Sequence, residues 1–138
     1  MSRQVLYIDD NDDNLTIVRR VLARNPDITL RTASTGRAGL AAAASDPPGL
    51  ILLDLHLPGL HGDEVLRRLK ASPATAGIPV AILSAEASPA VIRHMRASGV
   101  IAYLTKPLDL TELGELLDSF TAQYDHQAGP ASRTAPAP

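Results

Sequence analysis

The chain has 138 residues, of which 45% are hydrophobic, with a formal net charge of −2 and no cysteine. This length is sufficient for one domain with a buried core, and the small net charge gives no reason to expect binding to nucleic acid or to an anionic membrane. The lack of cysteine excludes disulfides, zinc–thiolate sites and thiol nucleophiles. Residues 1–3 leave no room for a signal peptide before the first apolar run, and no run approaches membrane-spanning length, so we expect a cytoplasmic protein without membrane contact.

Five short apolar runs predict the strands of a sheet. They begin near Val5, Ile28, Leu50, Val80 and Ile101. Most of them lack strict alternation of apolar and polar residues, which is typical of strands buried on both faces of a parallel sheet.

Helical patterns follow each of these runs. In chain order, their apolar or capping residues are Leu15, Val18, Val21 and Leu22; Gly36 and Leu40; Val65, Leu66 and Leu69; Ser88 and Pro89; and Leu110, Leu113, Leu116, Leu117 and Phe120. Alternation of five strands with five helices predicts a doubly wound α/β domain around a five-stranded parallel sheet. We expect the flavodoxin-like strand order 2-1-3-4-5, because crossovers are right-handed and this order has a single switch point.

The C-terminal end has a different composition. Residues 126–138 are rich in alanine, proline and glycine and contain no large apolar residue. This composition predicts a disordered tail or linker, which leaves residues 1–125 as the folded domain.

Charged or polar residues stand at the carboxyl ends of four of the five runs. They are Asp9 and Asp10, Asp54, Ser84, and Lys106. Ligands of an open parallel sheet bind in the crevice at the carboxyl ends of its strands, so we expect these side chains to converge on one pocket. Each residue taken singly has an ordinary explanation, such as a helix cap or a turn, but their common position at one predicted edge indicates a functional site.

The residue types in this set point to metal-assisted phosphoryl chemistry. Three carboxylates in one crevice repel one another unless a cation neutralises them, and carboxylates without histidine or cysteine are typical of a hard cation such as Mg²⁺. We therefore predict that Asp9 and Asp10 are metal ligands. Asp54 stands alone at its strand end and is the predicted nucleophile, which would form an aspartyl phosphate. The ammonium of Lys106 and the hydroxyl of Ser84 would then hold the phosphoryl oxygens.

Four segments carrying these residues, 5–10, 52–59 with Gly62 beyond, 83–85 and 103–107, together resemble the receiver domain of bacterial two-component response regulators, the CheY-like family. The resemblance covers about residues 3–122. It implies a phosphorelay role, in which Asp54 accepts a phosphoryl group from a phosphohistidine on a sensor histidine kinase or a histidine phosphotransfer domain. It also implies that Asp10, Asp54 and the backbone carbonyl of His56 bind Mg²⁺ directly, and that Asp9 binds it through water.

The resemblance further implies a conformational switch. The peptide bond between Lys106 and Pro107 would be cis. On phosphorylation, Ser84 would move toward the phosphate and Tyr103 would turn inward, which would alter the face made by the fourth helix, the fifth strand and the fifth helix. Tyr103 has an equally good alternative interpretation as a half-buried strand aromatic.

Several points stay open at the level of sequence. A pseudo-receiver, which binds proteins without being phosphorylated, is the main alternative. A metal-dependent phosphatase would need a cap that the chain has no room for, and a flavodoxin-like electron carrier would need a phosphate loop where this chain has the acidic segment 9–14. We expect no enzymatic activity beyond the chain's own phosphoryl transfer and dephosphorylation, an unidentified downstream protein partner, and a monomer or a phosphorylation-dependent dimer.

The sequences of residues 53–58, 83–85 and 102–109 resemble those of receiver domains in hybrid sensor kinases, which suggests that origin for the chain.

The histidines give no sign of a metal site. His56, His61, His94 and His126 lack the spacing of a metal-binding set, so we expect them to be surface residues.

Overall fold

A five-stranded parallel sheet forms the centre of the domain. The computed structural model describes the backbone of residues 3–133 and the side chains of residues 3–122. Within these residues the strands are β1 (Gln4–Ile8), β2 (Thr29–Ala33), β3 (Leu50–Leu53), β4 (Val80–Ser84) and β5 (Ala102–Thr105), in the order β2-β1-β3-β4-β5. All neighbouring strands pair in parallel. The predicted fold class and strand order are therefore confirmed.

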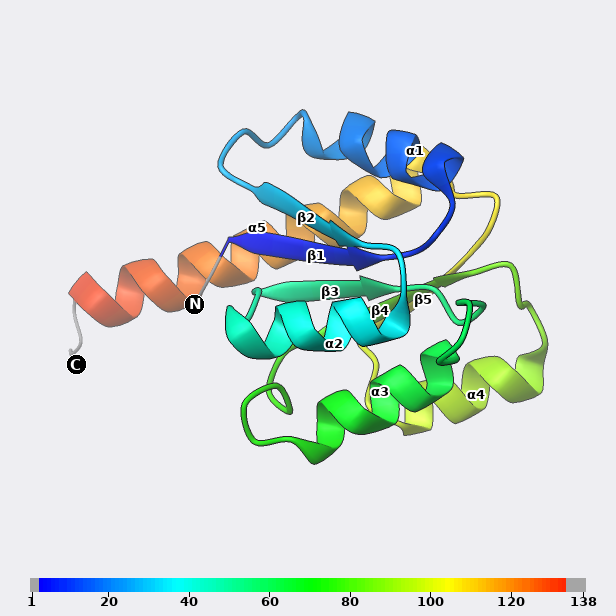
Figure 1. Cartoon of the computed structure of the whole chain (residues 1–138). Coiled ribbons are helices and arrows are strands. Elements are labelled where there is room, and N and C mark those ends of the chain that lie inside the picture. The colour runs from blue at the N-terminus through cyan, green and yellow to red at the C-terminus, as the bar shows by residue number, and fades with distance from the viewer. Residues whose placement is uncertain (1–2, 134–138) are drawn as a thin grey trace.

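Helices cover both faces of this sheet. They are α1 (Asp12–Leu22), α2 (Gly36–Ser45), α3 (Gly62–Ala71), α4 (Pro89–Ala97) and α5 (Leu110–Arg133). Figure 1 shows α1 and α5 on one face and α2, α3 and α4 on the other. Within the described residues, no helix combines the length and apolar character needed to cross a bilayer.

Each face of the sheet has its own hydrophobic core, and strand alternation assigns residues to one or the other. In β1, Val5 and Tyr7 face α1 and α5, whereas Leu6 and Ile8 face the other three helices. Because both faces are covered, β1, β3 and β4 read as nearly continuous apolar runs. The edge strands differ: β2 is only partly buried, and β5 begins one residue after Ile101, which is 52% exposed.

Local caps decide where the helices begin. Asn11, not a preceding aspartate, caps α1, and its side chain accepts a hydrogen bond from the N–H of Asn14 at 3.1 Å. This cap leaves Asp9 and Asp10 outside the helix. Ser88 is the N-cap residue of α4 and is followed by Pro89, as the sequence predicted, although the Ser88 side chain makes no capping hydrogen bond.

The last helix runs into the segment predicted as a disordered tail at 126–138, because the structure continues α5 beyond residue 125 to Arg133. Local propensity does not account for this extension, because Gly129 and Pro130 are the two poorest helix-forming residue types. Residues 134–138 lie outside the described part of the chain, so the domain limits of 1–125 and 126–138 stay a prediction.

Candidate functional site

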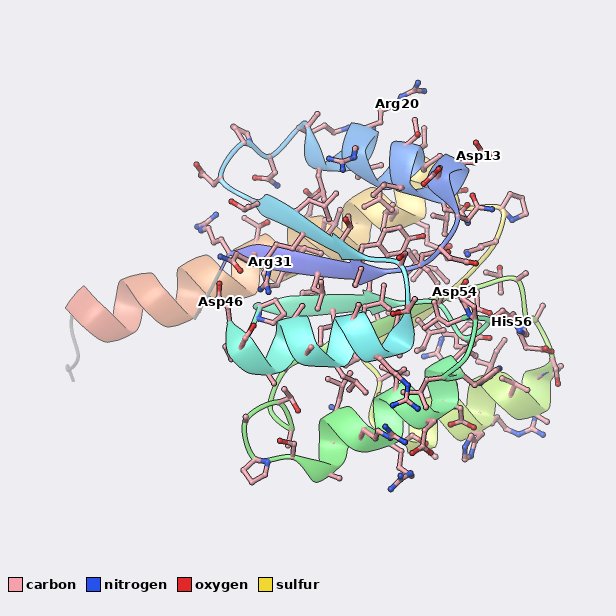
Figure 2. The ribbon with its side chains drawn as sticks, viewed as in Figure 1. Asp13, Arg20, Arg31, Asp46, Asp54 and His56 are labelled. Atoms are coloured by element: carbon pink, nitrogen blue, oxygen red, sulfur yellow. The ribbon has the colours of Figure 1, made fainter. Side chains whose placement is uncertain are left out.

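The carboxyl ends of β1 and β3 bring three carboxylates together. These strands are neighbours, with Ile8 opposite Leu53, and the N–H of Asp54 donates to the carbonyl of Ile8 at 3.0 Å. Carboxylate oxygens of Asp9, Asp10 and Asp54 all lie within 4.8 Å of one another. Figure 2 shows Asp54 at the end of the sheet opposite to Arg31 and Asp46.

Asp9 is the most completely enclosed of the three carboxylates, with no exposed side-chain surface. Its Oδ2 accepts hydrogen bonds from the Tyr7 hydroxyl and, at 2.9 Å, from Lys106 Nζ, and its Oδ1 accepts one from the N–H of Asn11 at 3.0 Å. Burial acts to raise the pKa of Asp9, but these donors outweigh it, so the pKa lies below the ordinary aspartate value. Asp9 is therefore held as a carboxylate by fixed donors.

Asp54 has a different environment although it shares the same cation. Its side chain is 6% exposed, its Oδ2 lies 3.4 Å from Lys106 Nζ, and its Oδ1 accepts a hydrogen bond from the N–H of His56 at 3.2 Å. Burial raises the pKa of Asp54 above the ordinary value, and the nearby Asp9 charge adds to this, whereas Lys106 and the His56 N–H oppose it. Of these two carboxylates, Asp54 is thus the one whose charge is less well compensated by the surrounding residues.

Lys106 reaches the two carboxylates from the loop after β5. Its N–H donates to the carbonyl of Ser84 at 2.9 Å, which continues the pairing of β4 with β5, and the following Lys106–Pro107 peptide bond is cis, as the resemblance implies. The side chain is 14% exposed and places one ammonium between Asp9 and Asp54. One cation facing three carboxylates leaves the group with excess negative charge.

Ser84 and Tyr103 are linked through the segment that follows β4. Ser84 is fully buried, and its Oγ accepts a hydrogen bond from the N–H of Glu86 at 3.1 Å. The Tyr103 hydroxyl donates to the carbonyl of the same Glu86 at 2.6 Å, and its ring is only 8% exposed. Burial raises the pKa of Tyr103, which keeps the hydroxyl protonated as a donor. The Tyr103 ring is therefore buried, and its hydroxyl is bonded to the segment that follows Ser84.

The start of α3 packs directly on the chain that carries Asp54. The N–H of Gly62 donates to the carbonyl of Leu55 at 2.9 Å, and a Cβ at residue 62 would collide with the Asp54 carbonyl and stand 2.6 Å from the Leu55 Cα. Only glycine allows this close approach. The loop after β3 is thereby fixed against the first turn of α3.

The acidic group fits a hard divalent cation. Among the described residues, Asp9, Asp10 and Asp54 are the one set of three or more histidine and carboxylate donors with all ligand atoms within 4.8 Å. Mg²⁺ prefers oxygen ligands, retains waters and commonly uses one or two carboxylates. Asp10 is exposed, so an ion at this set would keep access to solvent and to a phosphoryl oxygen. The roles predicted for individual ligands, including the carbonyl of His56, stay predictions.

One grouping of side chains is not predictable from the sequence. His56, His61 and His94 are surface residues, as expected, but they meet beside the acidic site. The rings of His56 and His61 are 5.7 Å apart between centroids and nearly perpendicular, and His94 Nε2 lies 3.8 Å from a carboxylate oxygen of Asp63. No signal in the sequence predicts this, because His94 comes from α4, far along the chain from the other two.

Comparison with known proteins gives concordant results. Residues 5–118 match the family model of the response regulator receiver domain. The chain is 37% identical over 109 residues to the response regulator PleD of Caulobacter vibrioides, covering 79% of this chain but only 24% of PleD. It is 32% identical over 120 residues to the polar-differentiation response regulator DivK of Brucella ovis, covering 87% of this chain and 97% of DivK. The chemotaxis response regulator CheY4 of Vibrio cholerae superimposes with a TM-score of 0.76 at 25% identity, covering 87% of this chain and 99% of CheY4.

Proposed function

Because the chain belongs to the response regulator receiver family and so acts in two-component signalling, we propose that Asp54 is its phosphoacceptor and that a sensor histidine kinase or a histidine phosphotransfer domain is the donor. In this reaction an oxygen of Asp54 attacks the phosphorus of a phosphohistidine. With the other ring nitrogen of the phosphohistidine protonated, the phosphorus–nitrogen bond breaks, the donor leaves as neutral histidine, and Asp54 becomes an acyl phosphate. Beyond this transfer and the later attack of water on the acyl phosphate, we propose no other enzymatic activity.

The position of the Lys106 ammonium supports this proposal most directly. It lies 2.9 Å from Asp9 and 3.4 Å from Asp54, so it stands beside the oxygen that would receive the phosphoryl group. Phosphoryl transfer depends mainly on positioning and on neutralising charge, and a fixed cation at the acceptor does both.

Mg²⁺ is the proposed cofactor, with Asp10 and Asp54 as direct ligands and Asp9 as a ligand through water. When bound, it supplies positive charge that neutralises the acceptor and the incoming phosphoryl oxygens. The chain's own contribution to Asp9 is visible without the ion, since Tyr7, Asn11 and Lys106 fix the orientation of that carboxylate.

Ser84 and Tyr103 are the proposed switch residues. A phosphoryl group on Asp54 would offer new acceptor oxygens to the Ser84 hydroxyl, which is already at the sheet edge. Any movement of Ser84 passes to Glu86, whose N–H donates to Ser84 and whose carbonyl accepts from Tyr103. We propose that the readout is the face of α4, β5 and α5, and that an unidentified protein binds it, with dimerisation of the chain as one form of output.

The test is the intact mass of the full chain after incubation with acetyl phosphate, with and without Mg²⁺, for the parent and for Asp54→Ala. We expect a gain of one phosphoryl group in the parent that requires Mg²⁺, is removed by hydroxylamine as an acyl phosphate should be, and is absent from Asp54→Ala. Circular dichroism of the variant controls for folding. Equal labelling of Asp54→Ala would show that the acceptor is wrongly assigned. No labelling of a folded parent that binds Mg²⁺, even with rapid quenching, would favour the pseudo-receiver.

A further inference from the structure

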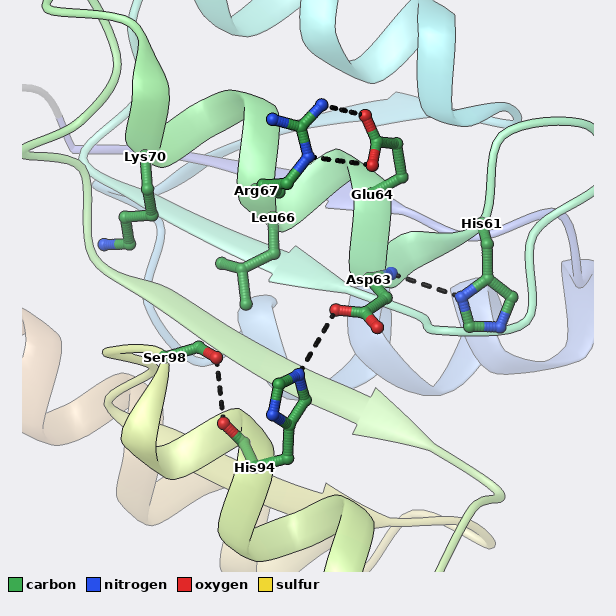
Figure 3. Close-up of a pocket in the computed structure, with 8 residues that line it drawn as sticks. All are labelled: His61, Asp63, Glu64, Leu66, Arg67, Lys70, His94 and Ser98. Carbon is green, nitrogen blue, oxygen red and sulfur yellow. Dashed lines mark hydrogen bonds and ion pairs between the residues drawn. The ribbon is translucent and has the colours of Figure 1, made fainter.

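Three of the four histidines in the sequence line one cavity beside the acidic site. The cavity has a volume of about 280 Å³ and lies between the loop after β3, the start of α3, the segment after β4, and α4. Its polar lining consists of His56, His61, Asp63, Glu86 and His94. A larger adjoining pocket between α3 and α4 shares three of these residues, His61, Asp63 and His94. Figure 3 shows the Asp63 carboxylate pointing toward His94 and the Asp63 backbone N–H joined to the ring of His61.

Contacts link these side chains into a continuous series. Glu86 lies 3.9 Å from His56 Nε2, and the His56 ring meets the His61 ring edge to face. The N–H of Asp63 donates to His61 Nδ1 at 3.3 Å, and the Asp63 carboxylate lies 3.8 Å from His94 Nε2. The series therefore runs from the β4 side of the cavity across α3 to α4.

The chemistry of this lining differs from that of the acidic site. Imidazole nitrogens combined with carboxylate oxygens suit borderline metals such as Zn²⁺, Ni²⁺ and Cu²⁺, whereas Mg²⁺ prefers oxygen alone. We propose that His61, Asp63 and His94 form a second metal site, selective for a divalent transition metal such as Zn²⁺, with water or a neighbouring donor completing the coordination.

One pair of donors is already close to the spacing of a metal site, and the third must turn to join it. Two ligands of a tetrahedral zinc stand about 3.4 Å apart, given metal–ligand bonds of about 2.0–2.2 Å. Asp63 and His94 are already at 3.8 Å, and their side chains are 55% and 63% exposed, so they can turn without disturbing the core. His61 would bind through Nε2, which moves the ring proton to Nδ1 and gives up the hydrogen bond from the Asp63 N–H.

The donors of this second site are more widely spread than those of the acidic site, which is the one set already gathered within 4.8 Å among the described residues. A metal would therefore have to gather exposed side chains from α3 and α4 instead of entering a closed cage. Since it binds only the folded arrangement, it would also raise the melting temperature of the protein. This site is independent of phosphorylation at Asp54.

The test is calorimetric titration of the metal-free full chain with Zn²⁺ in excess Mg²⁺, which occupies the acidic site. We expect one equivalent of Zn²⁺ to bind, and a matching titration with Co²⁺ to give the visible absorption of a nitrogen- and oxygen-ligated ion. The double variant His61→Ala/His94→Ala should bind at least about tenfold more weakly, because loss of outer partners of a metal alone costs about 10–100-fold. Arg93→Ala, an exposed neighbour on α4 that does not line the cavity, should bind like the parent.

Folding of the variants is checked by circular dichroism without metal. The double variant should melt somewhat below the parent, because His61 is the N-cap residue of α3 and its side chain accepts a hydrogen bond from the Asp63 N–H, whereas Arg93→Ala should melt like the parent. Absence of Zn²⁺ binding by the parent in excess Mg²⁺ would overturn the proposal. Undiminished binding by the double variant would also overturn it, since the ion would then sit elsewhere. A loss of Zn²⁺ on raising Mg²⁺ would assign the ion to the acidic site and would equally refute a second one.

Discussion

Asp54→Asn should raise the free energy of unfolding of the Mg²⁺-free protein, although it removes the proposed phosphoacceptor. The substitution keeps the shape of the side chain and removes one negative charge from a buried group of carboxylates. Asp54 is the right member to neutralise, because burial raises its pKa, whereas the donors around Asp9 lower the pKa of that carboxyl.

The magnitude follows from the distances. Two unit charges at 4.8 Å, the limit within which the three carboxylates lie, repel by about 3.5 kcal/mol at an effective dielectric constant of about 20. Asp54 experiences this from Asp9 and, more weakly through solvent, from the exposed Asp10. Its attraction to Lys106 at 3.4 Å is about 5 kcal/mol on the same scale, which is comparable to the summed repulsion. The charge interactions therefore nearly cancel, and desolvation of the Asp54 carboxylate, the largest cause of its raised pKa, decides the sign, so we expect a net stabilisation of about 1 kcal/mol.

Mg²⁺ and pH should both modulate this difference. Mg²⁺ bound as proposed, at a concentration 100-fold above its dissociation constant, should stabilise the parent by about 2.7 kcal/mol, and it should stabilise a variant that has lost a ligand by less. A raised pKa means that Asp54 gives up stability as the pH rises through that pKa. The difference in free energy of unfolding between Asp54→Asn and the parent should thus be largest at pH values above the raised pKa of Asp54. It should shrink as acidification protonates Asp54 in the parent.

Urea unfolding followed by circular dichroism, with EDTA and with Mg²⁺, measures these differences. The control is Asp13→Asn, which removes an exposed acid from the first turn of α1 and should change stability by no more than about 0.5 kcal/mol in either condition. A variant that is less stable than the parent in EDTA would show that the Lys106 attraction outweighs the carboxylate repulsion. An equal response of parent and variant to Mg²⁺ would remove Asp54 from the metal site.

Three other substitutions test separate parts of the structure. Tyr7→Phe removes a hydroxyl donor to a buried carboxylate and should lower the free energy of unfolding by about 1.5 kcal/mol in urea titrations; no change would mean that this hydrogen bond adds nothing. Gly62→Ala forces a Cβ against the backbone of Asp54 and Leu55 and should lower the free energy of unfolding by about 1–3 kcal/mol. In the control Gly77→Ala the new Cβ would meet no atom within 4 Å, so this variant should be as stable as the parent. Equal stabilities of the two variants would refute the packing argument. Lys106→Ala should retain some phosphorylation by acetyl phosphate in mass spectra but lose the accompanying change in the NMR signals of Tyr103, and a preserved change would exclude Lys106 from the switch.

The order of the strands and the site at their carboxyl ends were predictable because both depend on patterns within short stretches of the sequence. Four of the five apolar runs end in a charged or polar residue, and parallel strands with right-handed crossovers place those ends on one edge of the sheet. Asp9, Asp54 and Lys106 therefore meet as expected. The predicted starts of the edge strands, near Ile28 and Ile101, lie one residue before the observed starts of β2 and β5. These strands are only partly buried, so their apolar signal in the sequence is weaker.

Other features depend on contacts between residues far apart in the chain, which local patterns do not encode. The sequence by itself determined that carboxylates, a hydroxyl and an ammonium would share one edge of a parallel sheet. Only the tertiary structure decided that Tyr7 and Lys106 hold Asp9 as the low-pKa carboxylate and leave Asp54 as the high-pKa one, because burial and donor placement arise only once the chain is packed. The same holds for His61 and His94, which meet because α3 and α4 lie on one face of the sheet.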